Sequence, residues 1–182
     1  ATARKAKNGE DIVEGMRVVT SADGYATLMF YDNSVARLAP STDIKLEKLS
    51  HDPEHPTKDK IGIFVTAGRV WSRVLNLLNL DAEYELQSSS TVATVRGTTF
   101  DFIVEEKDGE RWTHVNGAES IVDCKTKKWN GLLKRKEWLH VPENADKAAK
   151  TVTVSEESLK RLKLDGVVKN GGDAFKELVN PA

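Results

Sequence analysis

Few groups of side chains in this sequence have types and spacing that could do chemistry, and the densest lies in residues 51–55. His-Asp-Pro-Glu-His places two imidazoles and two carboxylates close together, and a divalent metal ion accepts such ligands. No further ligand cluster follows at the spacing of a known zinc or calcium motif, and Pro53 interrupts the segment. The pattern favours a solvated loop, so we predict no metal site and no cofactor.

Catalysis has little support among the nucleophiles and bases. The serines of residues 88–90 have no histidine near them in the sequence, and no motif marks His114 or His140 as a general base. A triad assembled from distant positions stays open. Cys124 is the only cysteine, which excludes an intramolecular disulfide and a C-x-x-C redox or zinc site. We therefore predict a protein that binds and is not an enzyme, with no catalytic residues.

A basic segment between residues 125 and 136 surrounds a tryptophan. It is suited to an acidic protein face or another polyanion, and a charged edge strand that discourages aggregation is the alternative interpretation. In an interface, a tryptophan among positive charges resembles a hot spot with a rim that steers association. The predicted partner-binding residues are Lys125, Lys127, Lys128, Trp129, Lys134, Arg135 and Lys136.

A second charged group is acidic and surrounds one expected hairpin. Its spacing does not match a calcium-binding loop, so we interpret these carboxylates as a solvated sheet edge. The residues are Asp101, Glu105, Glu106, Asp108 and Glu110.

Composition limits the partners. Lysine and arginine number 27 against 28 aspartates and glutamates, so the net charge of −1 gives no overall attraction to nucleic acid or to anionic lipid. No run reaches the roughly 18 apolar residues of a membrane span. The chain begins with Ala1 and not with methionine, and both removal and absence of a leader or membrane anchor at the N-terminus agree with the sequence.

The elements that must position these groups are short strands. About ten runs between residues 11 and 141 alternate apolar and polar side chains, with turn residues at the roughly 8–12-residue spacing of all-β folds. No long amphipathic helix interrupts them, which disfavours a parallel α/β fold. The expected turns are Asp23-Gly24, Ala67-Gly68, Asp108-Gly109, Asn116-Gly117 and Asn130-Gly131.

The C-terminal part of the chain changes character. Ser155 is a good N-cap, acidic residues follow it, and basic residues lie near Gly166, as the helix dipole favours. Leu159 and Leu162 would face the body. We therefore expect residues 1–10 to form a tail, 11–141 an all-β domain, and 142–182 a linker with C-terminal helices. The fold class is an elongated β-roll, solenoid-like or sandwich body with a small helical appendage.

The strongest β-signal in the chain lies in residues 90–104. Phe100, Phe102 and Val104 alternate with other residues, which places three large side chains on one face of a strand. A glycine inside such a run indicates a bulge, a corner or a close backbone approach. Arg96 could be a buried or bidentate anchor for a carboxylate, or could hold this corner together. The predicted structural residues are Arg96, Gly97, Thr98, Phe100 and Phe102.

Read from Gly15 onward, the order of these motifs resembles the FecR domain of bacterial envelope signalling proteins, over residues 10–124. The hallmark is Ala93-Thr94-Val95-Arg96-Gly97-Thr98-Thr99-Phe100. Before it come a turn at Asp23-Gly24, an alternating strand at residues 26–30 and an Asp-X-Ser turn at Asp32-Asn33-Ser34. Next come a strand that ends at proline, residues 35–40, a further strand, residues 43–47, and the Gly-Arg-Val segment Gly68-Arg69-Val70.

The resemblance implies an elongated extracytoplasmic all-β domain. In the iron-uptake regulators of the family this domain follows a transmembrane helix, contacts an outer-membrane transporter and governs a sigma factor. The present sequence contains neither the anti-sigma segment nor the membrane helix, so the resemblance supports the fold more than sigma-factor regulation.

Two functional hypotheses follow. The first is a binding and signalling module of the cell envelope, in the periplasm or at the cell surface, with a protein or glycan partner. The second is a cell-envelope hydrolase or small-ligand-binding β-roll whose site is assembled across strands. A pocket lined by convergent polar groups would favour the second hypothesis.

Overall fold

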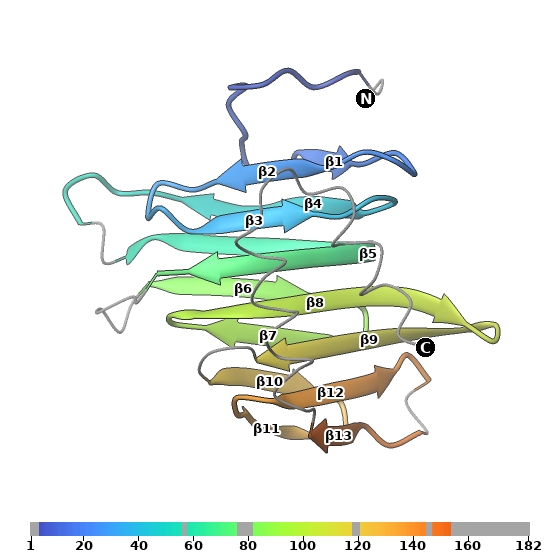
Figure 1. Cartoon of the computed structure of the whole chain (residues 1–182). Coiled ribbons are helices and arrows are strands. Elements are labelled where there is room, and N and C mark those ends of the chain that lie inside the picture. The colour runs from blue at the N-terminus through green and yellow to red at the C-terminus, as the bar shows by residue number, and fades with distance from the viewer. Residues whose placement is uncertain (1–3, 56–57, 76–81, 118–120, 145–146, 154–182) are drawn as a thin grey trace.

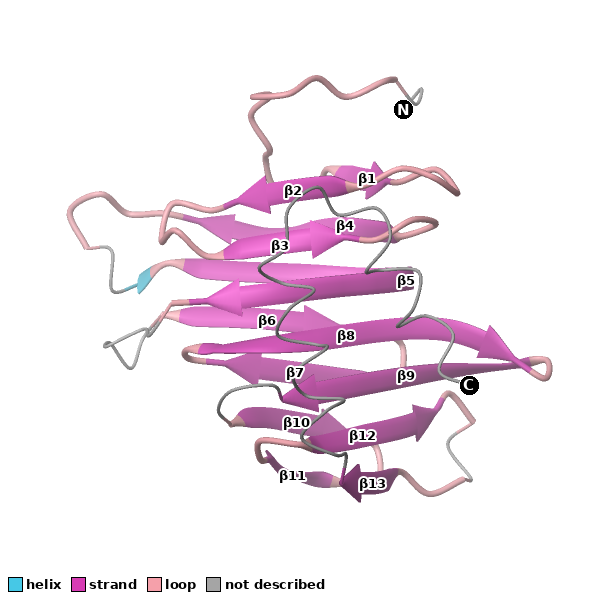
Figure 2. Cartoon of the chain, viewed as in Figure 1, coloured by secondary structure: helices cyan, strands magenta, loops and turns pink. Residues whose placement is uncertain are grey.

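The computed structural model describes residues 4–55, 58–75, 82–117, 121–144 and 147–153. Within these residues the chain forms thirteen strands and no α-helix (Figures 1 and 2). The strands are β1 (Arg17–Val19), β2 (Ala26–Met29), β3 (Val35–Leu38), β4 (Asp43–Ser50), β5 (Lys60–Val74), β6 (Glu83–Gln87), β7 (Thr91–Val95), β8 (Thr98–Lys107), β9 (Glu110–Gly117), β10 (Val122–Thr126), β11 (Asn130–Leu133), β12 (Glu137–Pro142) and β13 (Lys150–Thr153). The described part of the chain has no helix that is long and apolar enough to cross a membrane.

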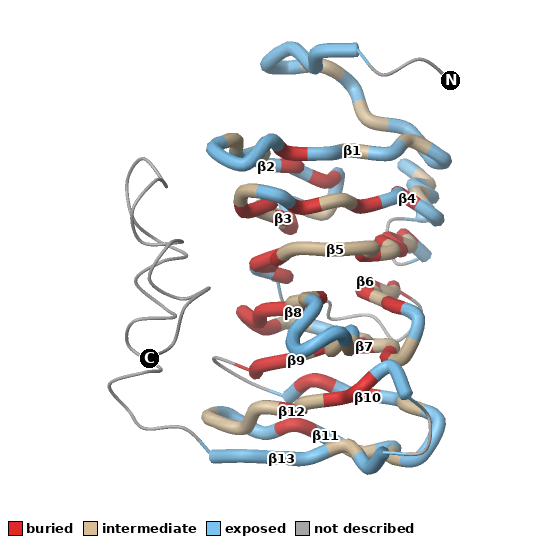
Figure 3. The backbone as a smooth tube through the Cα atoms, turned by 90° about the vertical axis from the view of Figure 1, so that its right-hand side faces the viewer, coloured by how far each residue is buried: buried red, intermediate tan, exposed pale blue. Residues whose placement is uncertain are grey.

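The strands form two facing layers that share β5 (Figure 3). In the first layer, here called sheet A, the order is β1-β4-β5-β6-β7-β10-β11. In the second layer, sheet B, it is β2-β3-β5-β8-β9-β12-β13. The β5–β6 pair is parallel, and all the other pairs are antiparallel. Because the hairpins β6–β7, β8–β9, β10–β11 and β12–β13 alternate between the sheets, the body grows along one axis.

Strand β5 passes from one sheet to the other at Gly68. Its first part pairs with β4 and β6 in sheet A, and its last part pairs with β3 and β8 in sheet B. Gly68 has φ = +90°, and a Cβ atom there would lie 2.5 Å from the Cα atom of Thr42. Only glycine fits such a corner, because the conformation and the neighbouring backbone both exclude a side chain.

The core lies between the two sheets and is filled by alternate side chains of nearly every strand. Phe100 and Phe102 of β8 are fully buried in it. The rings of Phe30 and Phe100 meet the buried Tyr84 ring edge-on, at centroid distances of 6.0 and 6.2 Å. The Tyr84 hydroxyl lies 3.0 Å from the Ser72 hydroxyl, which satisfies a polar group inside an apolar core.

The all-β class and the elongated two-layer body agree with the prediction. The helices predicted after Ser155 lie outside the described residues, and the domain boundaries stay predictions. Strand β13 was not predicted, and it extends sheet B into the segment expected to be a linker.

Three of the expected turns are wrong. Ala67-Gly68 lies inside β5, where a single strand bends, and Asn116-Gly117 and Asn130-Gly131 lie within β9 and β11. Asp23-Gly24 does lie between two strands, although those strands belong to different sheets. The turn at Asp108-Gly109 is confirmed, and both residues have positive φ, 55° and 72°.

Candidate interaction surfaces

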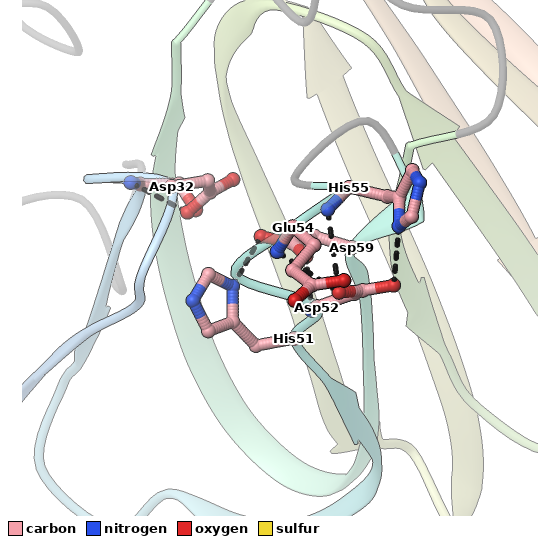
Figure 4. Close-up of polar contacts among 7 residues, drawn as sticks. Asp32, His51, Asp52, Glu54, His55 and Asp59 are labelled. Atoms are coloured by element: carbon pink, nitrogen blue, oxygen red, sulfur yellow. Dashed lines mark hydrogen bonds and ion pairs between the residues drawn. The ribbon is translucent and has the colours of Figure 1, made fainter.

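The loop between β4 and β5 contains the histidines and carboxylates that the sequence brought together (Figure 4). Asp59 is buried, and its carboxylate accepts hydrogen bonds from His51 Nδ1 at 2.8 Å and from the Asp52 backbone N–H at 3.1 Å. Asp52 accepts the backbone N–H groups of Glu54 and His55 and contacts His55 Nδ1 at 3.0 Å. These hydrogen bonds hold the pKa of Asp52 below its usual value, and the bond from the Glu54 backbone N–H has the largest effect.

The carboxylates of this loop therefore close the loop itself. In the described part of the chain, no three or more histidine, cysteine, aspartate or glutamate side chains are grouped so that they could hold a metal ion. The structure thus gives the carboxylates of Asp52 and Asp59 structural partners.

A shallow groove lies next to this loop, at the end of the body formed by β1 and β2. Its volume is about 200 Å³, and its lining includes Ile12, Met29, Tyr31, Leu49 and His51. Met29 and Tyr31 are 70% and 80% exposed, and the Tyr31 ring stacks on the His51 ring at a centroid distance of 4.3 Å. The groove is smaller than the roughly 300–1,000 Å³ of a typical ligand site, so its exposed apolar side chains fit a protein contact better.

The serines considered as nucleophiles form a structural network. Ser88 Oγ lies 2.8 Å from Thr113 Oγ1, and Ser90 Oγ donates to the same atom at 3.1 Å. Ser89 Oγ donates to Glu143 Oε1 at 2.5 Å. These bonds tie the β6–β7 turn of sheet A to sheet B.

The predicted partner-binding residues lie around β11, an end strand of sheet A. Lys127 and Lys128 occupy the β10–β11 turn, and Lys134 to Lys136 follow β11 at its other end. Leu132, at the middle of this edge, is 55% exposed. Sequence reasoning missed this leucine, although its alternation with the buried Leu133 could have identified it.

Trp129 differs from its expected role as an exposed hot spot. It is half-buried and packs against the core. A Cβ atom at Gly131 would lie 2.7 Å from the Trp129 ring, and the Trp129 backbone exchanges hydrogen bonds with Thr126. Trp129 therefore also holds the β10–β11 hairpin. Leu132 is exposed, as are Lys125, Lys127, Lys128, Lys134 and Arg135, and Lys136 is half-buried.

The buried bidentate arginine is Arg69, whereas Arg96 is exposed, so Arg96 is not a buried anchor, and its role at the corner stays a prediction. Arg69 donates from Nε and Nη2 to the two carboxylate oxygens of Asp101, at 2.7 and 3.0 Å. Asp101 is only 2% exposed, which also corrects its assignment to a solvated acidic edge. Gly97 has φ = +144° and links β7 of sheet A to β8 of sheet B.

The outer face of sheet B carries an aromatic and histidine cluster. The Nδ1 atoms of His114 and His140 are 2.6 Å apart, and His114 Nε2 lies 3.1 Å from Glu105 Oε1. Trp112 stacks parallel to His114 and Trp138 parallel to His140, at interplanar angles of 4° and 5°. Burial lowers the pKa of both histidines, which favours their neutral forms.

Comparison with known proteins places this arrangement in a family. The model of a family described as FecR protein matches residues 16–118. The chain therefore belongs to the FecR family, a class of signalling proteins associated with the cell envelope. No curated protein matches the sequence.

Two crystal structures of a "putative anti-sigma factor" from Parabacteroides distasonis share the fold. Both have a TM-score of 0.63, with sequence identities of 10% and 12%. The match covers 80% of this chain and 63% of the other, so the present chain corresponds to less than two thirds of that protein.

Proposed function

We propose that this chain is a non-enzymatic, extracytoplasmic binding and signalling module of the bacterial cell envelope that acts by contacting a protein partner. The FecR match over residues 16–118 is the observation that carries the proposal. The name of the structural neighbours, an anti-sigma factor, supports a regulatory role of the same kind.

The edge of sheet A at β11 is the surface that best fits such a contact. An end strand offers unpaired backbone groups to which an extended segment can add as a further strand. The exposed Leu132 lies between basic residues at both ends of the strand. This arrangement of an apolar centre and a charged rim suits a partner segment that is extended, partly apolar and acidic.

The proposed contact residues remain Lys125, Lys127, Lys128, Trp129, Lys134, Arg135 and Lys136, and Leu132 joins them. Lysine and arginine at the rim speed association through long-range attraction, and they contribute less to the lifetime of the complex. Leu132 would contribute the desolvated contact.

A capture experiment from envelope extract, followed by mass spectrometry, tests the proposal. The wild-type chain is compared with a variant that carries glutamate at Lys127, Lys128, Lys134 and Arg135. A matched control makes the same charge change far from β11, with glutamate at Lys5, Lys7, Lys48 and Lys58, all of which are exposed. We expect a protein captured by the wild type and by the control and lost from the β11 variant.

Kinetics with the identified partner then separate the two contributions. Neutralising the rim, or adding salt, is expected to slow association. Leu132→Asp is expected to speed dissociation, and Trp129→Ala is expected to weaken binding by about 2 kcal/mol or more. Equal capture by all the variants would refute the β11 surface. Turnover of a peptide, ester or glycan substrate that a point substitution abolishes would refute the non-enzymatic assignment.

A further inference from the structure

An exposed tyrosine at the groove beside the β4–β5 loop is held in one orientation. Tyr31 is 80% exposed, and its ring stacks on the His51 ring at an interplanar angle of 8°. The His51 ring is oriented in turn by the buried Asp59 carboxylate, 2.8 Å from Nδ1. So exposed a ring buries little area and contributes little to the stability of the fold. Its fixed position favours a role in binding, because a side chain that is already ordered loses less conformational entropy when a partner arrives.

The groove lies where the β2–β3 turn and the β4–β5 loop come together at one side of the body (Figures 1 and 4). Its apolar lining includes Val13 and Met29, which are 54% and 70% exposed. Its charged lining residues, among those that the structure describes, are Glu14, Asp32 and Asp59, with no lysine or arginine. The groove therefore combines exposed apolar side chains with negative charge.

Two of these carboxylates use only one oxygen in the described hydrogen bonds. Asp32 accepts the Ser34 backbone N–H at 2.9 Å and the Ser34 hydroxyl, both with Oδ1. Glu14 accepts the Leu49 backbone N–H with Oε2 at 3.1 Å. The second oxygen of each carboxylate takes no part in these bonds, so it can accept from a donor of a partner.

The arginines of this chain that precede β2 have other partners. Arg4 pairs with Glu10, and Arg17 pairs with Asp43. The basic residues around β11 lie at the opposite end of the body. A cationic group of another molecule would therefore complement the charge of the groove.

We propose that the groove binds an arginine side chain of a partner protein, with apolar side chains of the same segment against Val13 and Met29. A guanidinium is planar, so it stacks on the open face of the Tyr31 ring while its N–H groups donate to a carboxylate. The volume of about 200 Å³ suits one side chain better than a whole small molecule. The proposal is independent of the contact at β11, which takes an acidic segment.

Amide NMR spectra of the full chain during peptide titration give the first test. The probe is the peptide acetyl-Leu-Arg-Leu-amide, and the control peptide carries citrulline, an uncharged residue of nearly the same shape, in place of arginine. We expect saturable shifts at the amides of Met29, Tyr31 and His51, with the citrulline peptide bound at least about tenfold more weakly. Equal affinity for the two peptides, or no saturable shift at these amides, would refute the proposal.

Charge-neutral variants give the second test. Glu14→Gln with Asp32→Asn removes two charges from the groove and keeps oxygen atoms that accept the local backbone N–H groups. This variant is expected to bind the arginine peptide severalfold more weakly and to lose most of the preference over citrulline. The matched control, Glu106→Gln with Asp123→Asn, makes the same changes at exposed carboxylates elsewhere and should bind like the wild type. Identical affinities of the two variants would contradict the assignment to this groove.

A dilution series without peptide tests a second copy of the chain as the occupant. The basic residues around β11 of one molecule would then fill the groove of the next. We expect the amide resonances of Met29 and Tyr31 to keep their positions at every protein concentration. Positions that change with concentration would show that the groove binds another copy, and the proposal of a separate arginine-bearing partner would be wrong.

Discussion

The ion pair between Arg69 and Asp101 gives the sharpest stability prediction. The two side chains are 2% and 3% exposed, and both carboxylate oxygens accept a guanidinium N–H. Asp101→Ala leaves the guanidinium buried beside a void. Removing one partner of a buried ion pair costs about 3–5 kcal/mol, because the remaining charge stays in a poorly solvated site.

This loss is a large fraction of the roughly 5–15 kcal/mol that stabilises a typical domain. For a chain of this size each kcal/mol corresponds to about 2–4 °C, so we expect Tm to fall by about 6–20 °C. Thermal unfolding followed by circular dichroism measures the change. Urea unfolding, with the slope compared between variants, shows whether the native state stays compact.

Two controls show whether loss of this ion pair causes the destabilisation. The pair of Arg17 and Asp43 has the same side-chain types but lies at the surface, with the two side chains 67% and 17% exposed, and Asp43→Ala is expected to cost only about 0–1 kcal/mol. The double change Arg69→Met with Asp101→Leu removes both charges and should cost less than Asp101→Ala. If Asp101→Ala and Asp43→Ala melt at the same temperature, Arg69 is solvated in the native state and the reasoning fails.

Three further predictions concern the corner, the core and pH. In urea unfolding, Gly109→Ala is expected to cost ~1 kcal/mol and Gly68→Ala more than that. Both residues have positive φ, but only a Cβ atom at Gly68 would collide with neighbouring backbone. Equal losses would show that this close approach is not the cause. Phe102→Ala is expected to cost about 3–5 kcal/mol in the same assay, and a loss below ~1 kcal/mol would show that β8 does not line the core. Burial, the largest cause, lowers the pKa of His140 in the folded state. Near and below pH 6.5, the ordinary pKa of histidine, the unfolded state therefore binds more protons than the folded state. The free energy of unfolding is expected to fall as the pH drops from about 7.5 to about 5.5. His140→Gln should therefore flatten the fall of Tm with pH more than His55→Gln at an exposed site, and identical profiles would contradict a role for His140.

Local pattern was enough to predict the class of fold. Alternation identified most strands, and the family motif identified the family, because both are properties of neighbouring residues. The turn at Asp108-Gly109 was predicted correctly, since two positive φ values strongly favour that dipeptide. The same type of signal failed at Asn116-Gly117 and Asn130-Gly131, where pairing with adjacent strands keeps both dipeptides in extended backbone.

Contacts between distant strands could not be predicted from local pattern. Nothing near Asp101 in the sequence indicates that Arg69, in another strand, neutralises it, so its charge suggested exposure. Likewise, the pairing of Trp71 with Asp101, of Asp101 with Asn116 and of Asn116 with Trp138 depends on the register of four strands, and a shift by one residue would turn each side chain to the other face. Strand register is set by contacts throughout the body, and the same contacts place β11 at the end of sheet A.

The described crossings between the sheets give the family motif a physical meaning. The chain passes from sheet A to sheet B at the β1–β2 connection, Gly68, Gly97 and the β11–β12 connection, and the last three contain a residue with positive φ, at 90°, 144° and, at Lys136, 74°. The return from β3 to β4 uses Ser41 at 54°. A change of direction over one or two residues favours a backbone conformation that L-residues disfavour, whereas the β1–β2 connection turns gradually between Val19 and Ala26. The Gly-Arg-Val segment and the Val-Arg-Gly-Thr segment therefore mark two corners of the body, and Arg69 and Asp101, which follow these corners, tie the two strands together on the outer face. The family motif therefore encodes the path of the chain between the two sheets.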